Sequence, residues 1–336
     1  IKMILLKYKI IYKKSYLLMK IGKKLLYFSV FLSITFFSCS APIGSKEPAQ
    51  NNPNSGAVGA SLLTQTHVFY QDLAGAMKET ANQRNINLRI QYAEFDPRKQ
   101  NDQIEMFILQ GVRALVVAPT DSSGMAPLIK QAMDKKIPVF TVDIAVKDTD
   151  VICHIASDNY QGGVLLGEFL AKQLNGQGKV AIIDHPTVTS VQERVKGFED
   201  ALAKYPDIAI VQKIPGEGQR DKAMRSAQDL IASRSDLSAI FGINDDSALG
   251  ALASIESAGL QDKIKIVGFD ATPEACQAIR DGKALIADIA QFPKEIGKVA
   301  METIDEYFKG AQPPRVKYVP VKLITRETLL SEGSNL

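Results

Sequence analysis

Residues 238–273 constrain the fold more than any other part of the chain, because they alternate between apolar runs and a helical pattern. The run 239–243 has the length of a buried strand, and 264–269 forms a second such run. Between them, leucine, isoleucine and alanine recur at helical spacing until Gly259, a typical helix end. The pattern predicts a strand–helix–strand unit, in which the two strands are parallel.

Polar side chains follow both of these strands. Asn244 comes after the first strand and Asp270 after the second, and Asp245 or Asp246 is expected to cap the intervening helix. The carboxyl ends of parallel strands meet at one edge of the sheet, which is where open α/β sheets bind ligands. We therefore expect Asn244 and Asp270 to share a binding site.

The same rhythm runs through most of the chain. Residues 57–143 predict a βαβαβα series, 151–158 are interpreted as a connection, and the series restarts at 159. Further helices are expected at 68–83, 98–110, 123–136, 159–174, 190–204, 219–233 and 293–309. The fold class predicted is α/β, with two similar lobes, each built on a doubly wound parallel sheet.

The charge is divided unevenly along the sequence. The whole chain has 40 Lys and Arg against 37 Asp and Glu, but residues 1–38 hold eight of the lysines and no acid. The remainder has 32 basic and 37 acidic side chains, a net charge of −5, so no basic field indicates nucleic-acid binding.

The basic start precedes an apolar run at 25–37, which is the pattern of an export signal, and Met19 is a credible start for it. Cys39 follows directly, and the segment 36–39 is similar to a bacterial lipoprotein cleavage box, although two Phe depart from the usual residues. We interpret 1–38 as a signal segment, Cys39 as the lipidated residue and 39–59 as a flexible tether. An uncleaved membrane anchor and an ordinary cleaved signal are the alternatives.

The other two cysteines lie far apart in the sequence. Cys153 is in an apolar segment and Cys276 is in the helix after Asp270, and neither has a metal ligand at short spacing. We predict two buried free thiols.

Several motifs resemble the periplasmic ribose-type sugar-binding proteins, whose fold is shared by the effector domains of LacI-type repressors. The matching segments, in chain order, are VVAPTDSSG (116–124), IPVFTVD (137–143), HIASDNYQGG (154–163), QERVKGF (192–198), NDDSALGAL (244–252), IVGFDATPEA (266–275) and IAQFPKEIG (289–297). The resemblance extends from about residue 61 to about 325 and implies a type I periplasmic binding protein.

This resemblance implies a division of the chain that the strand–helix rhythm cannot show. The amino-terminal lobe is expected to hold 60–157 and 292–319, and the carboxyl-terminal lobe 158–291 and 320–330. The chain then crosses between the lobes near residues 157, 291 and 319, and these three crossings form a hinge.

The resemblance also implies a set of ligand-binding residues. It places the ligand against Ser61, Gln65, His67, Asp143, Arg194, Asn244, Asp270 and Gln291. A sugar hydroxyl is both donor and acceptor, so carboxylates, amides and a guanidinium are suitable partners. Asp143 and Asp270 could instead cap helices, Arg194 could be a solvated surface charge, and Ser61 is readily explained as a turn residue.

The sequence departs from the ribose-type pattern within the expected site. Ile144 replaces an arginine, Gly218 replaces an aromatic residue, and Ala118 replaces an amide. The first-loop aromatics appear as His67 and Val68, with Phe69 and Tyr70 as possible substitutes, although the spacing of Phe69 is also that of a helix core residue. Two acids against one arginine favour a neutral or weakly cationic ligand over a phosphorylated one. These departures disfavour ribose itself, and a different pentose or hexose, a polyol or another polar metabolite fits the site as well.

Motifs of enzymes are absent from the sequence. There is no dinucleotide or P-loop glycine motif, no G-x-S-x-G, and no metal-ligand spacing around the three histidines, of which only His67 is expected near the cleft. Asp143 and Asp270 could be imagined as a glycosidase pair, but the resemblance assigns them to binding. We predict no catalysis, no cofactor and no metal.

The interpretation is a monomeric, exported, lipid-anchored substrate-binding protein of an ABC-type importer, located in the periplasm or on the outer cell surface. Its expected partners are a sugar or sugar-like solute and a membrane permease, with no nucleic acid. The alternative is a sensing subunit for a chemoreceptor or sensor kinase without transport. A LacI-type repressor is excluded because an export signal stands where its helix-turn-helix would be.

Overall fold

The structure, a computed structural model, describes residues 56–331. The predicted signal segment, Cys39 and most of the predicted tether lie outside these residues. Within them, no helix is long and apolar enough to cross a membrane.

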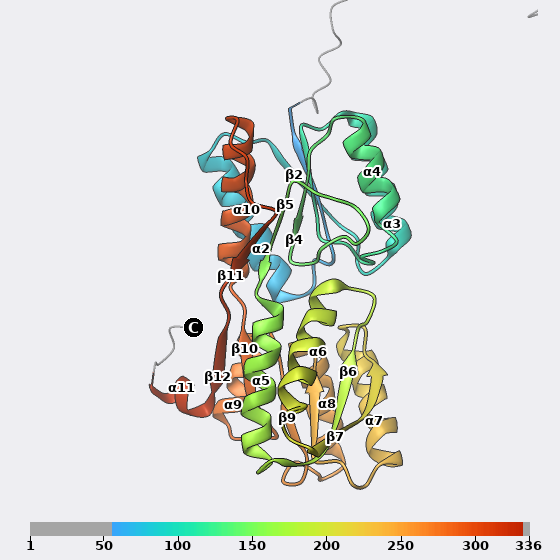
Figure 1. Ribbon diagram of the computed structural model, residues 1–336, viewed down its shortest axis with the longest axis vertical. Coiled ribbons are helices and arrows are strands. Elements are labelled where there is room, and N and C mark those ends of the chain that lie inside the picture. Colours follow the sequence, from blue (N-terminus) through green and yellow to red (C-terminus); the bar gives the residue numbers. More distant parts are fainter. Residues whose placement is uncertain (1–55, 332–336) are drawn as a thin grey trace, which may run out of the picture. The chain divides into compact units, whose positions relative to one another are not determined.

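Two six-stranded sheets organise the described chain (Figure 1). The first sheet has the spatial order β11 (Val316–Val319), β5 (Cys153–Ser157), β4 (Val139–Val142), β3 (Ala114–Val117), β1 (Val58–Leu62) and β2 (Leu88–Tyr92). All its strands are parallel. Helices α2 (Val68–Gln83) and α10 (Pro293–Phe308) pack together on one face, and α3 (Pro97–Gln110) and α4 (Ala126–Asp134) cover the other.

The second sheet has the order β12 (Lys322–Thr325), β10 (Leu285–Ala290), β9 (Lys265–Val267), β8 (Ala239–Gly242), β6 (Gln177–Asp184) and β7 (Asp207–Pro215). Only its edge strand β12 is antiparallel. Its helices are α5 (Asn159–Gln173), α6 (Thr189–Leu202), α7 (Arg220–Ser233), α8 (Asp245–Ser257), α9 (Pro273–Arg280) and the short α11 (Arg326–Ser331). We call each sheet with its helices a lobe, the first and the second in this order.

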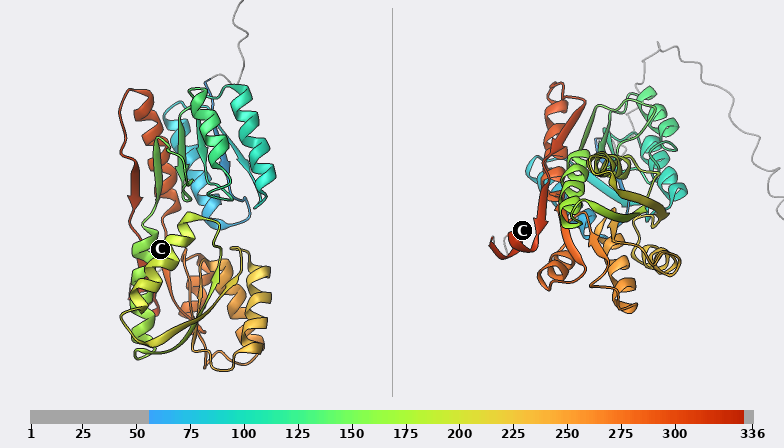
Figure 2. Two further views of the ribbon diagram at one scale, coloured as in Figure 1. Left: turned by 45° about the vertical axis from the view of Figure 1, so that its right-hand side comes forward. Right: turned by 60° about the horizontal axis from the view of Figure 1, so that its bottom comes forward.

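The chain passes between the two sheets three times within the described residues: between β5 and α5, between β10 and α10, and between β11 and β12. Figure 2 shows the last of these as a red segment that runs along the side of both lobes. Helix α10 thereby returns to the first lobe although it follows the strands of the second.

Local sequence explains the boundaries of helix α3 and the burial of strand β3. Helix α3 begins where Asp96 accepts hydrogen bonds from the amides of Arg98 (2.8 Å) and Lys99 (3.3 Å), with Pro97 in the first turn, and it ends at Gly111 in the left-handed conformation. Strand β3 consists of four fully buried apolar residues, as expected for a central parallel strand.

The predicted α/β class with two doubly wound sheets is confirmed, and Cys153 and Cys276 are buried free thiols as predicted. Two local predictions are wrong. Residues 151–158 are not a mere connection, because Cys153–Ser157 form strand β5 between β4 and β11. The cap of α8 is Asn244 rather than either aspartate, since Asn244 has the extended backbone and its side chain accepts from the amide of Ser247.

Candidate functional site

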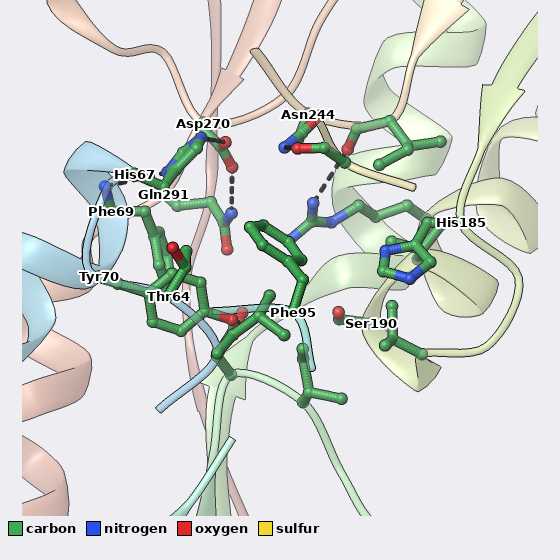
Figure 3. A pocket seen from close by; sticks show the side chains of 18 residues that line it. Thr64, His67, Phe69, Tyr70, Phe95, His185, Ser190, Asn244, Asp270 and Gln291 are labelled. Carbon is green, nitrogen blue, oxygen red and sulfur yellow. Dashed lines mark hydrogen bonds and ion pairs between the residues drawn. The ribbon is translucent and has the colours of Figure 1, made fainter. Parts of the chain in front are cut away.

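A cavity lies between the lobes, at the carboxyl ends of strands from both sheets (Figure 3). Its lining combines polar groups with apolar and aromatic side chains. The residues are Leu63, Thr64, His67, Phe69, Tyr70, Phe95, Asp143, Ile144, His185, Val188, Ser190, Val191, Arg194, Gly218, Ile243, Asn244, Asp270 and Gln291. Six of the eight ligand-binding residues expected from the sequence are among them, and they come from both lobes.

Asp143 follows β4 in the first lobe, is 5% exposed and has a left-handed backbone with φ 63°. The Tyr70 hydroxyl of α2 donates to its Oδ2 at 2.5 Å. Burial raises the pKa of Asp143 to about 6, against the lowering effects of Arg194 and the Tyr70 hydrogen bond. The same burial, together with the neighbouring carboxylate, raises the pKa of Tyr70, so the tyrosine remains a hydrogen-bond donor.

Arg194 lies on α6 of the second lobe and is 4% exposed, so it is not a solvated surface charge. Its Nε donates to Asn159 Oδ1 at 2.8 Å and its Nη1 to the carbonyl of Ile243 at 3.0 Å. The guanidinium also stacks over the ring of Phe269, 3.9 Å from the centroid. Neither hydrogen bond uses Nη2. The second lobe therefore holds a fixed cation against the cavity.

Asp270 follows β9 in the second lobe and contacts the first lobe through His67. His67, in the first lobe, places Nε2 3.3 Å from Asp270 Oδ2. The His67 Nδ1 accepts the amide of Phe69 at 3.2 Å as the cap of α2, which leaves the proton of a neutral ring on Nε2, directed toward the carboxylate. Gln291 Nε2 donates to Asp270 Oδ1 at 2.6 Å, while Gln291 Oε1 is buried without a partner.

Asn244 lines the cavity but already has partners within the protein. Its Oδ1 accepts from the amide and hydroxyl of Ser247, at 3.0 and 2.6 Å. Its Nδ2 donates to the carbonyl of Gly218 at 3.1 Å. The residue therefore fixes the start of α8 and the loop at Gly218 as well as facing the cavity.

Ser61 and Gln65 do not line the cavity. Ser61 lies within β1, fully buried, where its hydroxyl donates to Gln103 Oε1 at 2.8 Å. Gln65 is exposed, and its backbone amide faces the carboxylate of Glu94. Both residues belong to the strand–loop segment that carries His67, so the structure gives them supporting contacts rather than positions in the lining.

Three aromatic side chains of the first lobe line the cavity. Phe69 and Tyr70 meet edge to face with ring centroids 5.2 Å apart, and Figure 3 shows Phe95 near the centre of the view, between Tyr70 and His185. Phe69 is both a buried residue of α2 and part of the lining.

Sequence reasoning missed Phe95 and His185. His185 directly follows β6, so the rule that applied to Asp143 and Asp270, a polar residue just beyond a strand, points to it. Phe95 lies three residues after the end of β2 and is not polar, so that rule does not cover it. His185 was expected to lie away from the cleft. The structure places it in the lining, where burial lowers its pKa.

Two of the departures from the ribose-type pattern, Ile144 and Gly218, lie in the lining. Gly218 has φ +66°, and a Cβ there would come 3.4 Å from Asn244 Nδ2. A Cβ at this position would be in van der Waals contact with Asn244, and the positive φ is what disfavours a side chain there. Ala118 is buried outside the lining.

The lobes also make direct contacts through Ser122 and Ala145 of the first lobe and Thr187 and Thr189 of the second. The amide of Ser122 donates to the carbonyl of Thr187 at 3.1 Å, and the Ser122 hydroxyl accepts from the amide of Thr189 at 3.0 Å. The Thr189 hydroxyl accepts from the amide of Ala145 at 2.9 Å. Direct contacts between the lobes therefore exist both at His67 and Asp270 and at this second group of residues.

A pH dependence follows from the burial of Asp143. With a pKa of about 6, the folded chain keeps a proton that the unfolded chain, near pKa 4, has released. This bound proton adds at most about 3 kcal/mol to the free energy of unfolding. The contribution is fully present below about pH 4 and is lost as the pH rises through 6.

Asn at position 143 has no proton to lose. Without ligand, the free energy of unfolding of Asp143→Asn should therefore rise relative to that of the wild type between pH 4.5 and pH 8. Thermal unfolding of both proteins at the two pH values measures this difference. If the difference between the two proteins stays constant over this range, Asp143 does not carry the raised pKa.

Within the described residues, no group of three or more His, Cys, Asp or Glu side chains is arranged to hold a metal ion. The cavity offers hydrogen-bond donors, acceptors and aromatic faces instead. Such a lining is suited to holding a polar organic molecule.

Comparisons with known proteins agree with this architecture. A family model described as periplasmic binding protein domain matches residues 58–312. The chain is 33% identical over 267 residues to the ribose import binding protein RbsB of Salmonella typhimurium, covering 79% of this chain and 89% of that protein. It is 32% identical over 305 residues to RbsB of Bacillus subtilis, covering 89% and 98%.

Among solved structures, the periplasmic binding protein component of the arabinose ABC transporter from Shewanella sp. ANA-3, bound to L-arabinofuranose, is similar with a TM-score of 0.77. It is 30% identical, and the match covers 82% of this chain and 94% of that one. The resemblance that the sequence motifs indicated is confirmed: the chain belongs to the type I periplasmic binding protein family.

Proposed function

We propose that the chain is the exported substrate-binding protein of an ABC-type importer and takes a neutral polyhydroxylated solute, a sugar or polyol, between its lobes. The observation that carries this proposal is the set of hydrogen-bonding groups left facing one cavity from both lobes. Gln291 Oε1 is buried without a partner, Asp143 is a buried carboxyl, and Arg194 is a fixed donor. The relatives named for ribose and arabinose support the same class of solute.

The chemistry of the lining favours hydroxyl groups. Each hydroxyl gives one proton and accepts others, so it can bridge a carboxylate and a guanidinium. Two aspartates face a single arginine, which disfavours a phosphorylated solute. The Phe95 and Tyr70 rings offer apolar faces for the C–H side of a sugar ring.

Closure of the lobes is the proposed mechanism. The lobes would comprise 60–157 with 292–319, and 158–291 with 320–330, and the three crossing segments would bend as the hinge. A solute that contacts Asp143 in one lobe and Asp270 in the other favours the closed form, which a permease then recognises. Lipid attachment at Cys39 would keep the protein at the membrane, and mass spectrometry of the exported protein's first peptide tests this.

A thermal-shift screen of the exported protein tests the solute class. The panel holds pentoses, hexoses, polyols, nucleosides and amino acids. A solute at 100 times its dissociation constant should stabilise the protein by about 2.7 kcal/mol, a shift of several degrees. A shift by a sugar or polyol supports the proposal. A shift only by amino acids or nucleosides, or by nothing in a folded sample, would reject it.

Uptake measurements separate import from sensing. Deleting the gene should abolish cellular uptake of the radiolabelled solute identified in the screen. If uptake is unchanged while a transcriptional or chemotactic response to that solute is lost, the chain is a sensing subunit instead.

A further inference from the structure

Two buried carboxyl groups lie behind the segment that carries Asp270. Asp245, in the first turn of α8, is 1% exposed, and Asp288, in β10, is fully buried. Neither lines the cavity between the lobes. Charged side chains are seldom buried without a compensating partner, so this pair calls for an explanation.

Each carboxyl group holds one backbone amide of the segment 270–272. Asp245 Oδ2 accepts from the amide of Thr272 at 2.6 Å, and Asp288 Oδ1 accepts from the amide of Ala271 at 3.0 Å. The backbone there is unusual for residues with side chains, with φ 129° at Asp270 and 54° at Ala271. Such conformations persist only where surrounding contacts impose them.

The second oxygens of the two carboxyl groups converge. Asp245 Oδ1 and Asp288 Oδ2 are both buried without a donor in the described chain. Both lie beside Gly268, where an added Cβ would come 2.4 Å from Asp288 Oδ2 and 3.2 Å from Asp245 Oδ1. Gly268 thus makes room for the two oxygens to face each other.

Within residues 56–331, no Lys, Arg or His side chain forms an ion pair with either of these two groups. The charged and titratable groups that act on them most strongly are Asp270, in the segment after β9, and Cys276, on α9. Arg220 is paired with Asp246 and Glu274, and Arg280 acts on Cys276. Burial raises the pKa of both carboxyl groups, and the charge of Asp288 raises the pKa of Asp245 further.

We propose that Asp245 and Asp288 share one proton and act as positioning residues, which hold the 270–272 segment so that Asp270 points into the cavity. One carboxyl donates that proton to the facing oxygen of the other, and the remaining oxygens hold the two amides. The hydrogen bonds to the amides of Ala271 and Thr272 support the positioning of the segment. The effect of this positioning on solute binding rests on the proposed function.

Removing the shared proton would leave two carboxylates face to face without a cation. Their repulsion would separate the oxygens and loosen the hydrogen bonds to the amides of Ala271 and Thr272. Because the proton is held above the ordinary carboxyl range, this loosening comes as pH rises. The affinity for a solute that contacts Asp270 would fall with it.

Hydrogen exchange of these two amides tests the positioning without any solute. Protection of the Ala271 and Thr272 amides, relative to their intrinsic exchange rates, should fall at least tenfold from pH 6 to pH 9. In Asp288→Asn the side-chain amide donates permanently to Asp245, so protection should change less than twofold. Asp245→Asn should behave alike, which keeps the test valid if one variant does not fold.

Two controls isolate the effect. Asp184→Asn removes another largely buried carboxyl of the same sheet and should retain the wild-type pH response. The amide of Gly268, bonded to the Ala287 carbonyl in the ladder, should keep its protection throughout. Flat protection of Ala271 and Thr272 in the wild type, or an equal fall in both asparagine variants, would overturn the proposal.

A carbon NMR titration of the aspartate carboxyl groups adds a direct measurement on the wild type. One step well above pH 5, shared by Asp245 and Asp288, is expected, and two independent steps near pH 4 would contradict a shared proton. Binding of D-ribose, or of the panel sugar with the largest thermal shift, should weaken over the same pH range more in the wild type than in the two asparagine variants, which share with it the ionisation of Asp143. Absence of any sugar binding would reject the proposed function and leave the exchange result as the test of the pair.

Discussion

Asp270→Ala is expected to weaken solute binding by roughly 10- to 150-fold. A hydrogen bond to a charged group contributes about 1.5–3 kcal/mol, and the carboxylate of Asp270 faces the cavity at the junction of the lobes. The substitution also removes Asp270 Oδ1, the acceptor of the Gln291 Nε2 hydrogen bond. It removes Oδ2 as well, and therefore the contact with His67 of the other lobe. Alanine retains a Cβ, so the cost of the φ of 129° does not change. Isothermal titration with the solute found in the screen measures the effect.

Asp246→Ala is the matched control for this substitution. Asp246 is an acid of the same lobe, 3.9 Å from His67 Nε2, but its side chain does not line the cavity. It forms an ion pair with Arg220 that is partly exposed to solvent. Its removal should change the affinity less than about twofold. Equal losses in the two variants would show that the carboxylates act through their general field rather than through contact with the solute.

Gly163→Ala is expected to destabilise the fold by about 3–5 kcal/mol. Helices α5 and α6 touch at this glycine, where a Cβ would lie 2.1 Å from the carbonyl oxygen of Arg194. The clash is with backbone, so no side-chain rotation relieves it and the helices must separate. The midpoint of thermal unfolding should fall by roughly 6–20 °C. Because α6 carries Arg194, solute binding should weaken as well.

Gly75→Ala is the matched control for Gly163→Ala, and it is expected to stabilise the protein rather than destabilise it. Gly75 lies within α2, and a Cβ there would meet no atom within 4 Å. Alanine should stabilise the helix by about 0.5–1 kcal/mol. If Gly163→Ala unfolds within about 2 °C of the wild type, the close approach of α5 and α6 is not required for the fold.

The positions of polar residues after the strands predicted several residues of the cavity, because the rule about strand ends applies to any parallel α/β sheet. Parallel strands end at one edge, so Asp143, Asn244 and Asp270 were predictable from their positions after apolar runs. Phe95 and His185 also follow strands of the two sheets. They were missed because aromatic residues were expected in the first loop and at position 218, and because the histidines were judged by metal-ligand spacing. The signal for His185 was in the sequence.

Ser61 shows where the rule is insufficient. It lies near the carboxyl end of β1, but its hydroxyl donates to Gln103 on α3 rather than facing the cavity. Which way a side chain near a strand end turns depends on the helices that pack against the sheet. Sequence spacing does not contain that information.

The sequence alone determined the alternation of strands and helices, and hence the α/β class, because apolar periodicity and helix caps act within a few residues. It also determined which residue types stand at the strand ends. The tertiary structure decided which of these meet. His67 and Asp270 are 203 positions apart, and only the packing of the lobes brings Nε2 and Oδ2 within 3.3 Å.

Burial was likewise decided by the tertiary structure. Asp245 is adjacent to Asp246 in the sequence, yet one is enclosed with Asp288 and the other pairs with Arg220 at the surface. The ionisation of a carboxyl group depends on its desolvation and on neighbours from distant segments. Those quantities exist only once α8, β9 and β10 have packed together.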